Sequence, residues 1–105
     1  MEGRGQRRRR RVKISQTVRV RPSSPSDTYF EDVSLTVSAS PNGLYFTTRR
    51  DSYYKGMRVF VTFPYSRSAD RGDCEYIGEV LNVESLGSTP RGVAVRFLSK
   101  MNLIS

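Results

Sequence analysis

Five consecutive arginines, Arg7 to Arg11, are the residues of this sequence with the most evident chemistry. A guanidinium group is permanently charged and presents a planar fork of N–H donors that matches the oxygens of phosphates and carboxylates. Residues 1–13 hold seven basic side chains against Glu2 alone, a net charge of +6, while the whole chain carries +8. The charge is therefore concentrated on one arm, which predicts an anionic partner bound near the N-terminus.

A terminal arginine run is commonly a solvated tail or a non-specific nucleic-acid contact. Two features favour a more specific anion site. The run leads directly into an expected strand, so its last arginines are tethered to a sheet. A polar, glycine-containing loop is expected at residues 38–43, between two strands that could pair beside the first.

The remaining composition favours a binding module over an enzyme. The chain has 105 residues, enough for one domain, with no histidine and a single cysteine, Cys74. These counts exclude a Ser-His-Asp or Cys-His nucleophile and the usual zinc sites, and no Walker-type glycine-rich loop is present. We expect no metal, no cofactor and no contact with a membrane. One cysteine and the lack of an apolar signal segment favour a reducing cytoplasm.

The elements that must position the arm are strands. Short segments rich in β-branched and aromatic residues alternate with turn signals, and no segment of ten or more residues has a convincing helical period. The expected strands are Thr17–Arg21, Tyr29–Val37, Leu44–Thr48, Met57–Phe63, Cys74–Val83 (with a possible bulge at Gly78) and Val93–Leu98. This pattern predicts an all-β fold, a small antiparallel barrel or sandwich.

Alternation along these strands also predicts which side chains form the core. The expected inward positions are Val18, Val20, Leu35, Val37, Leu44, Phe46, Val59, Val61, Val80, Val93, Val95 and Phe97.

The order of these motifs resembles the PilZ domain family. Arg7-x-x-x-Arg11, followed by Val12 and Ile14, is similar to the family's N-terminal RxxxR element. Ser38-Ala39-Ser40-Pro41-Asn42-Gly43 resembles its [D/N]xSxxG element, and the apolar strand GLYFTT follows, as in the family. KGMRVFVTF and GVAVRFL resemble the fourth and last strands of a PilZ barrel. The likeness covers roughly residues 7–98.

The resemblance implies a six-stranded antiparallel barrel with a flexible basic arm, in a bacterial signalling protein that binds the second messenger cyclic di-GMP. Arg7 and Arg11 would contact guanine and phosphate, although Arg4 and Arg8 also satisfy the spacing, and Arg8 and Arg10 could add contacts. Ser38, Ser40 and Gly43 would complete the ligand site. Ser38 departs from the family's Asp or Asn. A decoy D-x-S at Asp32-Val33-Ser34 has Val37 in place of the glycine and is expected in mid-strand.

The resulting domain plan is an arm at 1–13, a PilZ-like barrel at 14–98 and a short tail at 99–105. Besides cyclic di-GMP, we expect a protein effector as partner. One alternative is a PilZ-like adaptor that binds no nucleotide and acts through protein contacts. Another is a small β-barrel nucleic-acid binder that stacks bases on Tyr45, Tyr53 and Tyr54 beside Arg49 and Arg50.

Overall fold

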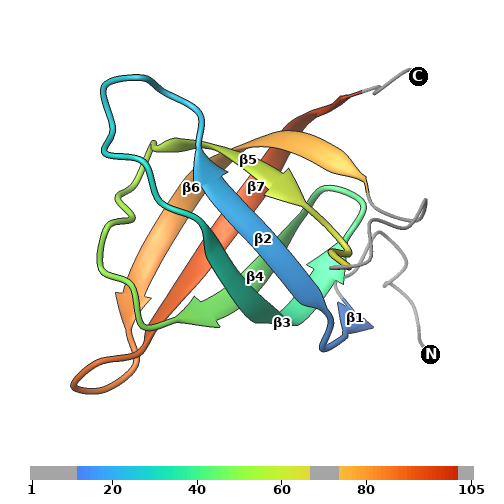
Figure 1. Cartoon of the computed structure of the whole chain (residues 1–105). Coiled ribbons are helices and arrows are strands. Elements are labelled where there is room, and N and C mark those ends of the chain that lie inside the picture. The colour runs from blue at the N-terminus through green and yellow to red at the C-terminus, as the bar shows by residue number, and fades with distance from the viewer. Residues whose placement is uncertain (1–11, 67–73, 102–105) are drawn as a thin grey trace.

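The computed structural model describes residues 12–66 and 74–101, which form strands joined by turns and loops. The strands are β1 (Val12–Lys13), β2 (Thr17–Pro22), β3 (Asp32–Ser40), β4 (Gly43–Thr48), β5 (Arg58–Thr62), β6 (Glu75–Ser85) and β7 (Arg91–Met101), as labelled in Figure 1. No helix within these residues is long and apolar enough to cross a membrane.

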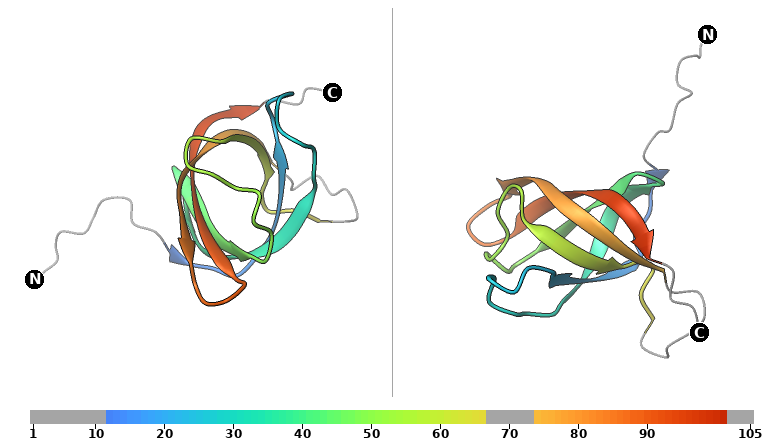
Figure 2. Two further views of the ribbon diagram at one scale, coloured as in Figure 1. Left: turned by 90° about the vertical axis from the view of Figure 1, so that its left-hand side faces the viewer. Right: turned by 90° about the horizontal axis from the view of Figure 1, so that it is seen from above.

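Strands β2 to β7 close into a six-stranded antiparallel barrel. Each strand pairs with its neighbour in the order β3-β2-β5-β6-β7-β4, and pairing of β3 with β4 joins the two ends. Figure 2 shows the ring in the view along the barrel. The two-residue strand β1 lies outside this ring and pairs with the end of β3. The barrel architecture expected from the resemblance to PilZ domains is confirmed.

The sequence located every barrel strand, with differences at the ends. Strand β3 begins at Asp32 rather than at residue 29 and continues to Ser40, and β7 continues to Met101. The ladder between β6 and β7 shifts register between Ile77 and Gly78, which confirms the bulge expected at Gly78.

The core prediction is correct for nine of its twelve positions, which are buried: Val18, Val20, Leu44, Phe46, Val59, Val61, Val80, Val93 and Val95. Phe97 packs half-buried at the margin of the core. Leu35 and Val37 are wrong, because both side chains point outward and are exposed. Three residues that the prediction did not include, Phe30, Tyr53 and Met57, are buried in the core.

The reason is that the inward positions of β3 are polar and find partners inside the fold. Thr36 is buried, and both of its hydrogen-bonding roles are satisfied by the segment that joins β1 to β2. Asp32 accepts hydrogen bonds from hydroxyl groups of β4 and of the loop that follows it. These contacts compensate for burying polar groups and fix the register of β3.

Candidate functional site

Strand β1, at the start of the described chain, lies next to the serine-containing end of β3. Val12 lies opposite Ala39, and Lys13 lies opposite Ser38, in an antiparallel pair. The predicted ligand arginines Arg7 and Arg11, the additional candidates Arg8 and Arg10, and Arg4 lie outside the described residues. The first described residue is nonetheless paired beside the expected serine motif, and Arg11 is covalently bound to it.

The chain between β1 and β2 is held in place by Thr36. The Thr36 hydroxyl donates to the carbonyl oxygen of Ile14 at 2.6 Å and accepts from the backbone N–H of Gln16 at 3.0 Å. The backbone adds two bonds, from the N–H of Ile14 to the carbonyl of Val37 and from the N–H of Thr36 to the carbonyl of Gln16. The base of the arm is therefore fixed to the barrel by four hydrogen bonds.

The expected loop at residues 38–43 is in fact a tight hairpin. Ser38 to Ser40 are the last residues of β3, Pro41 and Asn42 form the turn, and β4 begins at Gly43. A register shift between Thr36 and Ser38 marks a bulge, after which Ser38 lies opposite Tyr45. The ladder between β3 and β4 therefore continues to the pair Ser40 and Gly43, on either side of the turn.

The two serines of this hairpin differ in their surroundings. The Ser40 hydroxyl accepts from the backbone N–H of Asn42 at 3.2 Å and lies 3.5 Å from the carbonyl of Gly43, so it stabilises its own turn. The Ser38 side chain is half-buried and makes no hydrogen bond to the part of the chain that the structure describes. No described residue therefore competes with a ligand for its hydroxyl.

Packing alone requires glycine at position 43. A Cβ atom there would lie 2.1 Å from the carbonyl oxygen of Val95 and 3.1 Å from the Cα atom of Arg96, both in the backbone of β7. Strand β7 could not pair with β4 at this position beside any larger residue. The glycine of the motif therefore has a sufficient structural reason in the barrel itself.

The decoy element Asp32-Val33-Ser34 lies at the start of β3. The Asp32 carboxylate accepts from the hydroxyls of Thr48 and Tyr53 at 2.7 Å each and from that of Ser34 at 2.9 Å. Burial and the nearby Asp32 carboxylate raise the pKa of Tyr53 well above its ordinary value, which keeps its hydroxyl protonated as a donor. The three hydroxyls leave this carboxylate engaged in holding the fold together.

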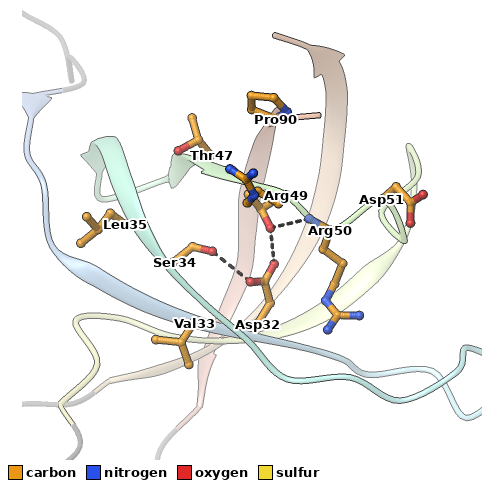
Figure 3. Close-up of a pocket in the computed structure, with 10 residues that line it drawn as sticks. Asp32, Val33, Ser34, Leu35, Thr47, Arg49, Arg50, Asp51 and Pro90 are labelled. Atoms are coloured by element: carbon orange, nitrogen blue, oxygen red, sulfur yellow. Dashed lines mark hydrogen bonds between the residues drawn. The ribbon is translucent and has the colours of Figure 1, made fainter. Parts of the chain in front are cut away.

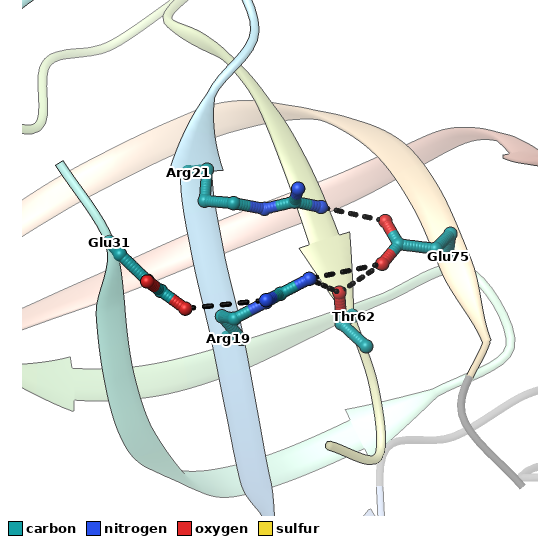
Figure 4. A network of polar contacts seen from close by, with 5 residues as sticks. All are labelled: Arg19, Arg21, Glu31, Thr62 and Glu75. Atoms are coloured by element: carbon teal, nitrogen blue, oxygen red, sulfur yellow. Dashed lines mark hydrogen bonds and ion pairs between the residues drawn. The ribbon is translucent and has the colours of Figure 1, made fainter. Parts of the chain in front are cut away.

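The barrel arginines Arg19 and Arg21 are also neutralised locally, as Figure 4 shows. Arg19 lies 3.3 Å from a carboxylate oxygen of Glu31 and 3.7 Å from one of Glu75, while Arg21 lies 2.8 Å from the other oxygen of Glu75. Thr62 donates a short hydrogen bond to Glu75. An incoming anion would have to compete with these carboxylates, so this face of β2 is a poor anion site.

The tyrosines considered for base stacking do not form one platform. Tyr53 is buried, and its ring packs edge-on against Phe30 and Phe46. Tyr45 donates to Glu84, and Tyr54 donates to Asp27. Tyr53 as an exposed stacking residue is wrong, because the loop after β4 carries it into the core.

A groove beside the start of β3 contains a pair of arginines that sequence reasoning treated only as part of the nucleic-acid alternative. The groove has a volume of about 790 Å³. Its lining includes Val33, Leu35, Thr47, Arg49, Arg50 and Pro90, which are labelled in Figure 3. Neither arginine forms an ion pair within the described residues. The sequence shows two adjacent arginines directly after an expected strand. That β3 lies beside them follows only from the tertiary fold.

Comparison with known proteins supports the fold. No protein-family model matches the chain, and no curated protein matches its sequence. A solved structure of the inhibitor of motility MotI/DgrA from Bacillus subtilis is similar, with a TM-score of 0.67 over 91% of this chain at 13% sequence identity. The similarity spans 44% of that protein's chain, less than half of its length. At this identity the likeness shows the shared barrel fold.

Proposed function

We propose that this protein is a regulatory module of the bacterial cytoplasm that binds cyclic di-GMP and acts on a protein partner. The observation that carries the proposal is the pairing of β1 with β3, which brings the base of the arginine arm beside Ser38 and Ser40. In PilZ domains the corresponding elements bind the nucleotide together. The PilZ-like barrel and its similarity to a protein described as an inhibitor of motility agree with a regulatory role.

The proposed binding step is closure of the arm over the nucleotide. Arg7 and Arg11 would direct their guanidinium groups to guanine O6 and N7 and to the phosphates, where bidentate geometry is favourable. The Ser38 hydroxyl, which has no partner among the described residues, would face the ligand at the base of the arm. Because the connection at Thr36 is already formed, the base of the arm is positioned beside Ser38 before a nucleotide binds.

Calorimetric titration with cyclic di-GMP, with GTP and single-stranded RNA as competitors, tests this function. Arg7→Ala and Arg11→Ala should each weaken binding by about 1–3 kcal/mol, the scale of a bidentate arginine–guanine contact. The matched controls Arg8→Ala and Arg9→Ala should cost much less, because screened long-range charge contributes little.

Equal losses from all four substitutions would instead indicate a diffuse electrostatic arm and favour a nucleic-acid partner. No heat of binding from the intact chain would leave the adaptor that binds no nucleotide as the better description. That second candidate is favoured by the hairpin itself, where Ser40 and Gly43 have structural reasons that require no ligand.

A further inference from the structure

The outward face of β3 is apolar and its inward face is polar, the reverse of what a barrel strand requires. Val33, Leu35 and Val37 are 52%, 56% and 42% exposed on the outside. Asp32 and Thr36 occupy inward positions, where hydrogen bonds compensate for their burial. Barrel packing therefore gives no reason for three consecutive outward aliphatic residues, and such a patch marks an interaction surface.

The arginine groove adjoins this apolar row. Val33 and Leu35 form part of its wall, Pro90 borders it, and Arg49 and Arg50 supply positive charge (Figure 3). The guanidinium of Arg50 lies 4.5 Å from the centroid of the Phe30 ring, which holds it beside the barrel without neutralising it.

Two carboxylates also line the groove, and they differ in their effect. Asp32 is occupied by three hydroxyl donors. Asp51 is exposed and has no partner among the described residues, so it partly opposes the charge of the arginines. The residual chemistry of the surface is aliphatic along β3 and cationic at Arg49 and Arg50.

The composition of the N-terminal arm makes it unsuitable as a cover for this row. Met1 is the only large apolar residue among residues 1–11, whose other side chains include six arginines. Like charge would also keep the arm away from Arg49 and Arg50. The surface requires an occupant with aliphatic side chains and negative charge.

We propose that the outer face of β3 and the adjoining groove bind a protein segment that presents a row of aliphatic side chains followed by acidic residues. Aliphatic side chains of the partner pack on Val33, Leu35 and Val37, and its carboxylates pair with Arg49 and Arg50. One edge of β3 pairs with β2 and β1, and the other pairs with β4 from Leu35 onward. Along Leu35 and Val37, recognition therefore occurs through side chains rather than by addition of a strand. This inference rests on the part of the proposed function that assigns the chain a protein partner.

The probe is a synthetic ten-residue peptide with leucines at alternate positions of its first half and glutamates in its second half, titrated into the full chain while amide shifts are followed by NMR. We expect saturable shifts centred on residues 33–37 and 47–51. Leu35→Ser and Arg49→Glu should each weaken binding about tenfold or more, the scale of losing a central contact. The controls Leu98→Ser and Lys55→Glu alter an exposed leucine and an exposed lysine outside the groove and should change affinity less than about twofold. Asp51→Ala should tighten binding.

Further arms of the experiment separate this occupant from others. A matched peptide with lysine in place of glutamate should bind at least about tenfold more weakly, since its charges meet Arg49 and Arg50. Equal binding of both peptides, or equal losses in the control variants, would overturn the proposal. Sedimentation showing a dimer that Leu35→Ser dissolves would assign the face to a second copy of the chain. Cyclic di-GMP shifting these same amides and displacing the peptide would assign the groove to nucleotide, whereas lack of nucleotide binding elsewhere would contradict only the proposed function.

Discussion

The two ends of strand β3 carry similar elements, Asp32-Val33-Ser34 and Ser38-Ala39-Ser40, in different surroundings. The first has the Asp and Ser of the PilZ pattern but Val37 in place of its glycine, and its carboxylate accepts hydrogen bonds from three hydroxyls inside the fold. The second departs from the pattern at Ser38, yet that hydroxyl is uncommitted within the described residues and lies opposite Lys13 at the base of the arm. A motif can serve a ligand only where the fold leaves its polar atoms free.

The largest expected effect concerns the glycine that completes the second element. Gly43→Ala should destabilise the protein by about 4 kcal/mol or more, because its Cβ would meet the backbone of β7, which cannot move aside cheaply. The matched control is Gly92→Ala, whose Cβ would meet only the movable end of the Tyr45 side chain and should cost about 1 kcal/mol. Urea unfolding of the three proteins measures both. Similar stabilities for Gly43→Ala and the parent would mean that packing does not require this glycine and that the ligand site does.

The next largest effect concerns the first element. Asp32→Ala should lower the free energy of unfolding by about 3 kcal/mol, because the hydroxyls of Tyr53 and Thr48 lose their acceptor in a half-buried site. Nucleotide affinity of the folded fraction should not change. Asp51→Ala, which removes a carboxylate with no partner in the described chain, should stay within about 0.5 kcal/mol of the parent. A large loss of cyclic di-GMP affinity in a folded Asp32 variant would mean that the first element, and not the second, contacts the nucleotide.

A smaller effect is expected where the arm joins the barrel. Thr36→Val keeps the shape of the side chain but removes its hydrogen bonds to Ile14 and Gln16, at a cost of about 2 kcal/mol. Amide hydrogen exchange at Ile14 should accelerate as β1 loosens from β3. Thr47→Val, on the outer face of β4, serves as the control and should leave that exchange rate unchanged.

The smallest effect is a gain. Ser38→Asp should tighten cyclic di-GMP binding by about 1–2 kcal/mol, because a carboxylate offers stronger acceptors to the N–H groups of guanine, less the cost of desolvation and phosphate repulsion. Titration of both proteins at one salt concentration gives the answer. Unchanged affinity with an intact fold would mean that Ser38 does not occupy the guanine-reading position.

Local alternation was enough to locate the barrel strands, since segments such as MRVFVTF place Val59 and Val61 inward as expected. Alternation did not predict which face of β3 is inward, because the hydrogen-bond partners of Asp32 and Thr36 come from segments up to 22 residues away. Phe30 was missed because taking Leu35 and Val37 as inward placed it on the outer face of the expected strand, and Tyr53 was missed because it enters the core from a loop, where no periodicity marks it. The position of the arm's base was also beyond local reasoning, since a two-residue strand has no distinctive pattern.

Anchoring of the arm at β1 has a consequence for its reach. Arg7 is five residues from Val12, so its Cα can never lie farther than about 18 Å from that of Val12, even on a fully extended chain. A tether this short keeps the guanidinium groups near the hairpin at an effective concentration of millimolar order, whatever the concentration of the protein. Val33 lies six residues along β3 from Ala39, about 20 Å at the rise of a strand, so the Cα of Arg7 cannot reach that end of the strand. A nucleotide at the hairpin and a partner in the groove would therefore approach each other only around Val37, which adjoins Ser38.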